Sequence, residues 1–112
     1  MNQDLSMIRG DTFSFLIRLP EIDPASITSL IFTVKRKATD SDDEAIIQKR
    51  LGDGIEPTDA EREWSVRVAP EDTDGVAAKK CVYDIQVGIM NDIYTLMGGY
   101  FRILQDVTEA RT

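Results

Sequence analysis

Apolar residues recur at every second position along most of this chain, and that period constrains the fold more than any other feature. The clearest run consists of Cys81, Tyr83, Ile85, Val87 and Ile89. Alternate side chains point to opposite faces of a β-strand, whereas a helix repeats about every 3.6 residues. The sequence therefore predicts an all-β chain.

The period-two segments divide the chain into about seven or eight short strands. We expect them at residues 6–9, 13–19, 30–35, 45–49, 64–68, 81–89, 94–96 and 100–104. Short strands at this spacing are typical of an antiparallel, immunoglobulin-like β-sandwich. Residues 69–75 carry Pro70 near their start, acids behind it and Gly75 at their exit, which predicts one short helical turn. Residues 51–62 are expected to form turns.

The composition fits a single domain over residues 1–112. Hydrophobic residues make up 42% of the chain, enough for a core, and no repeat or linker divides it. We predict burial of the more apolar face of each strand. The expected core residues are Phe13, Phe15, Ile17, Leu30, Phe32, Val34, Trp64, Val66, Tyr83, Ile85, Val87 and Phe101.

Acidic residues outnumber basic ones by 20 to 13, which gives a net charge of −7. That balance repels phosphate backbones and argues against nucleic acid as a partner. No apolar run approaches the roughly 20 residues that a membrane-spanning helix needs. The first residues lack the pattern of a signal peptide. We therefore expect a soluble protein, without a membrane span, that is made in a cytoplasm.

The chemistry-bearing residues argue against an enzyme. Histidine, the commonest general base and metal ligand, is absent. Cys81 is the single cysteine, which excludes an internal disulfide and a thiolate metal site. Carboxylates are plentiful but fall in loops and at solvent-facing strand positions, so no desolvated pair of the glycosidase kind is predicted. We expect no catalytic residue, no cofactor and no metal ligand.

Two polar motifs have a functional and a structural interpretation. Arg9-Gly10-Asp11 is a tripeptide that some adhesion receptors bind, but between two strands its glycine is expected to permit a bend. Asp40, Asp42, Asp43 and Glu44 could offer oxygen ligands to a cation. Their spacing lacks the glycine of an EF-hand loop, so we expect a solvated loop. The neighbouring Lys35-Arg36-Lys37 is expected to pair with that loop.

Three further positions are expected to be structural. Gly98-Gly99 predicts a bend or bulge between strands, since no helix follows it to help bind a phosphate. Trp64 shares the apolar face of its strand, which favours a core position over sugar stacking. Cys81 begins the most apolar run of the chain, so a buried, inert thiol is expected.

Five segments occur in an order that resembles a known family. They are residues 7–13 (MIRGDTF), 27–35 (ITSLIFTVK), 69–73 (APEDT), 83–87 (YDIQV) and 94–104 (YTLMGGYFRIL). Together they resemble the immunoglobulin-like domain at the N-terminus of phage baseplate upper proteins and of related phage or prophage fibre-associated proteins. The resemblance covers about residues 6–108 and implies a structural virion module that anchors or adapts receptor-binding fibres.

The resemblance also implies partners and a location. The partners would be other tail, baseplate or fibre proteins and further copies of this chain, in the virion and, during assembly, in the host bacterial cytoplasm. Baseplate upper proteins continue into a helical or fibre-binding region, so an accessory protein is expected here. Lys79 stands two residues before Cys81, where antibody-type domains carry tyrosine. The alternative is an adhesion module for a host surface or carbohydrate, with exposed aromatic residues as its platform.

Overall fold

The structure, a computed structural model, describes residues 2–108, and eight strands make up most of that range. The strands are β1 (Leu5–Ile8), β2 (Phe13–Arg18), β3 (Ile27–Lys35), β4 (Ile47–Leu51), β5 (Gly54–Pro57), β6 (Glu63–Val68), β7 (Lys79–Ile89) and β8 (Asp92–Leu104). Single helical turns, η1 (Pro24–Ser26), η2 (Asp42–Glu44) and α1 (Pro70–Thr73), lie between strands. No helix within residues 2–108 is long and apolar enough to cross a membrane.

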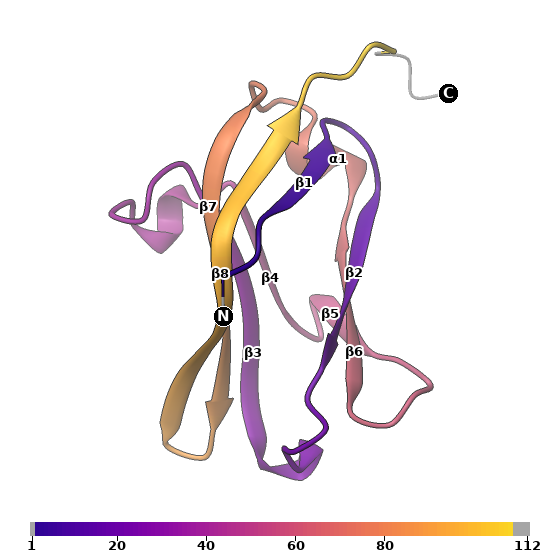
Figure 1. The fold of residues 1–112 in the computed structure, drawn as a ribbon, viewed down its shortest axis with the longest axis vertical. Coiled ribbons are helices and arrows are strands. Elements are labelled where there is room, and N and C mark those ends of the chain that lie inside the picture. The colour runs from indigo at the N-terminus through magenta and orange to yellow at the C-terminus, as the bar shows by residue number, and fades with distance from the viewer. Residues whose placement is uncertain (1, 109–112) are drawn as a thin grey trace.

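The strands form two facing layers. Hydrogen-bonded neighbours follow the order β1-β8-β7-β3-β4-β5-β6-β2. The ladder folds over at the short contact between β4 and β5, so that β2, β6 and β5 face β3, β7 and β8 (Figure 1). The neighbours β2-β6-β5 correspond to strands B, E and D of an immunoglobulin domain, and β3-β7-β8 to C, F and G. The predicted immunoglobulin-like β-sandwich is confirmed, with two short parallel ladders, β1–β8 and β4–β5, added to the antiparallel ones.

Aromatic rings from both layers meet in the middle of the core. The ring centroid of Phe32, on β3, lies 5.2 Å from that of Phe15 on β2. It also lies 5.9 Å from Tyr83 and 6.0 Å from Phe101. Antibody domains join their layers here with a tryptophan on strand C and a disulfide between B and F. In this chain Phe32 stands on the strand that matches C, and ring contacts join the layers instead.

The predicted core is confirmed except at one strand. All the expected core residues are buried apart from Phe13 and Phe15, which are half-buried. Both belong to β2, which ends the ladder and pairs with β6 alone. A strand at the edge of a layer has a neighbour on one side only, so its side chains keep more contact with solvent.

The structure corrects the prediction in residues 51–62. The strand β5 lies within this stretch, which was expected to form turns only. β5 is four residues long, and its paired residues run from Gly54 to Pro57. Glycine and proline are both depleted in strands, so sequence patterns hide a strand that begins and ends with them.

The structure also corrects the prediction at Gly98-Gly99. Both glycines lie inside the single long strand β8, and no bend separates two strands there. The N-terminal segment lies alongside β8 at this point, where Asn2 forms a parallel bridge with Gly98 and Gln3 N donates to Gly98 O at 2.9 Å. A Cβ atom on Gly99 would lie 2.7 Å from the Gln3 carbonyl oxygen. The glycines are therefore explained by the close approach of another backbone.

Candidate protein-interaction surfaces

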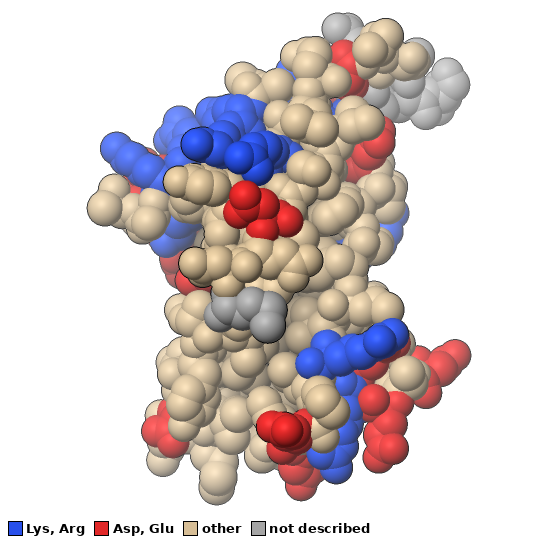
Figure 2. Space-filling view, viewed as in Figure 1, with Lys and Arg blue, Asp and Glu red and all other residues tan. Residues whose placement is uncertain are grey.

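Positive charge gathers at one end of this acidic molecule. Lys79 and Lys80 begin β7, Arg102 lies opposite Lys80 on β8, and Arg36 follows the last residue of β3. The charges of Lys79 and Arg36 both act on the Cys81 thiol, so groups from the two strands lie close together. The cluster is visible as a blue area on the upper left of Figure 2. We call these four residues the basic face.

Tyr100 lies beside two residues of the basic face, Lys80 and Arg102. Lys80 Nζ is 4.3 Å from its ring centroid, and the Arg102 guanidinium carbon is 5.8 Å away. Asp4 Oδ2 pairs with Arg102 at 3.3 Å. A hydrogen bond from Tyr100 N is the largest of the contacts that hold the pKa of Asp4 below its usual value. Among residues 2–108, no carboxylate forms an ion pair with Lys79 or Lys80.

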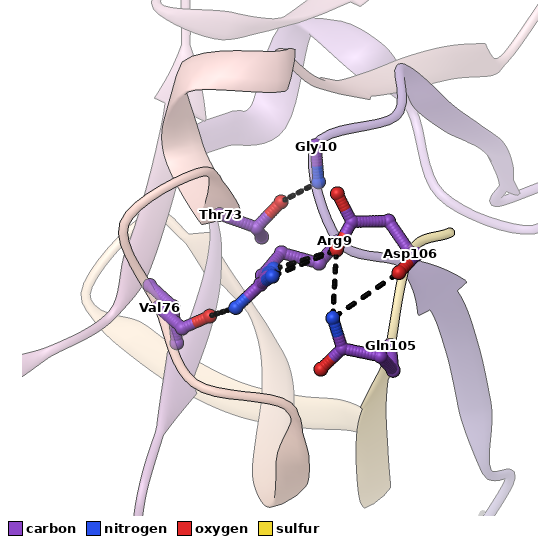
Figure 3. Close-up of polar contacts among 6 residues, drawn as sticks. All are labelled: Arg9, Gly10, Thr73, Val76, Gln105 and Asp106. Carbon is purple, nitrogen blue, oxygen red and sulfur yellow. Dashed lines mark hydrogen bonds and ion pairs between the residues drawn. The ribbon is translucent and has the colours of Figure 1, made fainter. Parts of the chain in front are cut away.

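The Arg9-Gly10-Asp11 tripeptide is part of an internal polar network (Figure 3). Arg9 Nη2 lies 2.8 Å from Asp106 Oδ1, and Arg9 Nη1 donates to Val76 O at 3.3 Å. Gly10 has a φ of 80°, which glycine tolerates, and its N–H donates to the buried Thr73 hydroxyl at 2.8 Å. The network ties the β1–β2 connection to α1 and to the end of β8. An adhesion receptor could not bind this arginine without breaking it.

The acidic segment that includes Asp40 and Asp42 forms the turn η2 beside the end of β3. Asp42 Oδ1 lies 2.8 Å from Lys35 Nζ, and Asp40 Oδ2 lies 3.8 Å from Arg36 Nε. The hydrogen bond and charge of Lys35 hold the pKa of Asp42 below its usual value. Within the described range, no three acidic or sulfur side chains come close enough together to hold a metal ion.

Trp64 and Cys81 lie inside the sandwich. Trp64 is 6% exposed, so its ring offers no platform for a sugar. Cys81 is fully buried, and burial raises the pKa of its thiol. A buried thiol with a raised pKa is a poor nucleophile, because the thiolate is the reactive form.

A hollow of about 220 Å³ lies on the outer face of β3, β4 and β7. Burial raises the pKa of Asp84 on its lining, whereas Lys35 lowers that of Asp42. Opposite shifts of two neighbouring carboxylates are the pattern of an acid–base pair. The Lys35 ammonium, however, already occupies Asp42, the carboxylate that would have to stay available as base or nucleophile. We assign the hollow no catalytic role.

Apart from Val107 near the end of the described range, the large apolar side chains with the highest exposed fractions belong to the hairpin formed by β7 and β8. Met90, Ile93 and Tyr94 are 75%, 70% and 52% exposed. The hairpin lies at the end of the sandwich away from the basic face and reaches the level of η1 (Figure 1). We call these three residues the tip surface. Ile93 and Tyr94 are successive residues of β8, so their side chains lie on opposite faces of the hairpin, and Met90 lies in its turn. Apolar side chains left in water around the end of a hairpin indicate a contact surface.

Met90 has an unfavourable backbone conformation as well as an exposed side chain. Its φ is 56°, in the left-handed region that costs a residue with a Cβ about 1–2 kcal/mol. Two hydrogen bonds hold the Met90 backbone against η1 and the start of β3. Met90 N donates to Ser26 O at 3.2 Å, and Thr28 Oγ1 donates to Met90 O at 3.5 Å. A long apolar side chain at a position suited to glycine suggests a role outside the fold.

The backbone beside the tip surface is also unpaired. β1 pairs with β8 only from Phe101 to Leu104, and Asn2 bridges Gly98. Within residues 2–108, the first half of β8, residues 92–97, has β7 on one side and no strand on the other. An uncovered strand edge is a template for pairing with another chain.

The sequence did not indicate either surface. The basic face combines residues from positions 36, 79–80 and 102, and only the strand pairing brings them together. The tip surface has a weak local signal in Met90, which precedes the turn-forming residues Asn91-Asp92 between the strands expected at 81–89 and 94–96. The last part of β8, Phe101 to Leu104, is covered by β1.

No family model and no curated protein matches the sequence. Among solved structures, the chain is similar to a putative glycoside hydrolase from Bacteroides vulgatus ATCC 8482, with 19% identity and a TM-score of 0.49 over 94% of this chain and 17% of that one. It is also similar to the extracellular domain of the voltage-gated sodium channel β4 subunit, with 10% identity and a TM-score of 0.44 over 95% and 93% of the two chains. The chain thus spans less than a fifth of the first protein's length. At these identities and TM-scores, neither similarity bears on function.

Proposed function

We propose that this protein is a non-enzymatic structural adaptor of a phage or prophage tail, baseplate or fibre, and that it works through protein–protein contacts. The observation that carries the proposal is the tip surface. Its three side chains are more than half exposed, and one of them occupies a backbone conformation that favours glycine. Because such an arrangement stabilises no part of the isolated fold, it is best explained by a partner.

The ordered sequence resemblance supports the assignment to a virion. The segments that resemble baseplate upper proteins fall on the elements that build the sandwich, including β3, α1 and β8. The resemblance therefore mainly concerns the framework, and Tyr94 is the one tip-surface residue that it includes.

A carbohydrate-binding module is the weaker candidate. A sugar platform needs aromatic rings with an open face. The Tyr100 ring is faced by Lys80 and Arg102, and Trp64 is buried. Tyr94 is the remaining exposed ring of the tip surface. Binding of the isolated protein to a glycan array, with loss of binding on Tyr94→Ala, would favour this candidate instead.

The test is incorporation into particles. Mass spectrometry of particles purified after induction of the lysogen that encodes the chain should detect the protein at a constant ratio to the major tail protein. Absence of the protein from intact particles would contradict the structural role.

The contribution of the tip surface is tested in the same particles. Met90→Gly keeps the turn and removes the side chain, so incorporation should fall while the melting temperature does not. Leu16→Ala is the matched control, because Leu16 is 51% exposed on β2, away from the tip surface. Equal incorporation of the Met90→Gly and Leu16→Ala proteins would exclude the tip surface as the contact.

A further inference from the structure

The end of the molecule that carries the tip surface is strongly acidic. Three connections meet there, residues 18–26, 58–63 and 90–92. They contain six carboxylates and two guanidinium groups. Arg18 Nε is paired with Glu63 at 2.5 Å, and Arg62 Nη1 donates to the carbonyls of Pro20 and Ile22. The exposed carboxylates left around the tip surface, which we call the acidic end, are Glu21, Asp23, Asp59, Glu61 and Asp92.

The acidic end and the basic face lie far apart along the molecule. The longest dimension is 42 Å, whereas charges in physiological salt are screened over about 8 Å. The two regions therefore do not neutralise each other within one chain. In Figure 2 the larger blue area lies near one end of the long axis, and the other end shows several red groups beside a smaller blue area. We call the basic face and the acidic end the two poles of the molecule.

Each pole also exposes apolar side chains. At the acidic end these are Met90, Ile93 and Tyr94. Beside the basic face, Ile8 and Leu104 are paired neighbours on β1 and β8 and are 44% and 46% exposed. Strand alternation puts Leu104 on the same side of β8 as Arg102 and Tyr100. Charge and apolar surface therefore complement each other at the two poles.

The isolated chain also carries an unfavourable arrangement at each pole. Lys80 and Arg102 are directly opposite each other on neighbouring strands, and like charges in that position destabilise a sheet. At the other pole Met90 holds its left-handed φ. Contact between the two poles would place carboxylates beside the cations and cover the methionine.

We propose that copies of this chain associate head to tail, with the acidic end and tip surface of one copy on the basic face of the next. This inference rests on the proposed function, because it names a second copy of the chain as the partner of the tip surface. The two contacting regions differ, so each added copy leaves one pole unoccupied. Such heterologous contacts build rings when the rotation between copies closes and filaments when it does not.

Sedimentation velocity on the purified full chain at low ionic strength provides the first test. We expect oligomers whose size grows with protein concentration, and dissociation to monomers at about 1 M salt, where the screening length is about 3 Å. A monomer at protein concentrations up to about 1 mM would overturn the proposal.

Charge reversal then tests which poles make contact. Lys79→Glu/Lys80→Glu reverses two cations of the basic face, and Asp59→Lys/Glu61→Lys reverses two carboxylates of the acidic end. For each variant alone, the constant for self-association should fall by at least about tenfold. An equimolar mixture should regain it, because each reversed pole then meets an opposite charge. A mixture that stays monomeric, while both variants melt like the wild-type chain, would overturn head-to-tail contact.

Control measurements separate this inference from the proposed function. Arg67→Glu, at an exposed position of β6, changes the net charge in the same direction as the lysine variant and should leave association unchanged. Binding of heparin to the basic face without self-association would overturn the inference in favour of a polyanion site. A monomeric chain that still enters particles through Met90 refutes the inference alone. An oligomer that is absent from particles refutes the proposed function alone.

Discussion

The two ends of the sandwich differ in which side chains they bury. At the end near α1, the Arg9 guanidinium and the Asp106 carboxylate are turned inward and joined 2.8 Å apart. At the hairpin end, Met90 and Ile93 are left in water at 75% and 70% exposure. The first end keeps polar groups inside the protein, and the second keeps apolar groups outside it.

The comparison separates stability from binding. The inward network at the α1 end lowers the free energy of the folded chain, because buried polar groups need partners. The exposed apolar side chains of the hairpin lower it only when a partner covers them. Substitutions in the inward network at the α1 end should therefore act on folding, and substitutions in the tip surface on association.

The largest effect is expected when the inward ion pair is broken. Arg9→Met removes the Arg9 guanidinium from the Asp106 carboxylate, which is 4% exposed. Removing one partner of a buried pair costs about 3–5 kcal/mol, and the exposed share of Arg9 places this case near the lower figure. Urea denaturation measures the change. Arg18→Met is the control, because Arg18 is 72% exposed and its 10% exposed partner Glu63 keeps the hydrogen bond from the Thr58 hydroxyl, so a loss of about 1 kcal/mol is expected. Equal losses would remove the distinction between the two ends.

A smaller loss is expected at Thr73. Thr73→Val keeps the shape of the buried side chain but removes the oxygen that accepts the Gly10 N–H at 2.8 Å. A buried donor without a partner costs about 1–3 kcal/mol. The free energy of unfolding should fall by that amount, and amide exchange at Gly10 should become faster. Slow exchange at Gly10 in the variant would show that another acceptor replaces Thr73.

Substitution of Asp84, which lies between the two ends, should raise the free energy of unfolding instead of lowering it. Burial raises the pKa of Asp84, so its charged form opposes folding, and this opposition disappears as pH falls through that pKa. Asp84→Asn should therefore add up to about 1 kcal/mol near pH 7 and nothing near pH 3, where the carboxyl is protonated in both states. A variant whose stability exceeds that of the wild type equally at both pH values would contradict this origin.

The smallest change in stability is expected at the tip surface. Met90→Gly removes the left-handed strain of about 1–2 kcal/mol. The added freedom of glycine in the unfolded chain offsets part of it, about 0.5–1 kcal/mol. The variant should be as stable as the wild type, or slightly more stable, in thermal denaturation. A loss above about 1 kcal/mol would show that Met90 supports the fold, and the contrast between the two ends would fail.

Much of the fold could be predicted from the alternation of apolar residues, because burial on one face of a strand requires that period. Val66 and Ile85 are fully or almost fully buried as expected. Positions whose conformation depends on distant chain were not predicted. Gly98-Gly99 was interpreted as a bend or bulge between strands. Nothing near these glycines in the sequence shows that a Cβ atom added to Gly99 would lie 2.7 Å from the Gln3 carbonyl oxygen.

The candidate surfaces were harder to predict than the fold. Lys80 and Arg102 are 22 positions apart in the sequence, and the β7–β8 register is what makes them neighbours. Exposure was equally hidden at Ile93, whose side chain continues the apolar composition of a strand but lies on the solvent side of the hairpin. The sequence shows that a residue is apolar, but the packing of the two strand layers determines whether its side chain is buried.

The parallel pairing of β1 with β8 has a mechanical consequence. Because the two strands run in the same direction, tension applied before Leu5 and after Leu104 pulls them past each other lengthwise. All the hydrogen bonds between them then bear the force together, along with the Arg9 N to Leu104 O bond of 2.9 Å. A hairpin pulled from its open end would instead lose one bond at a time. The geometry therefore suits a part that has to transmit tension along its length without unzipping.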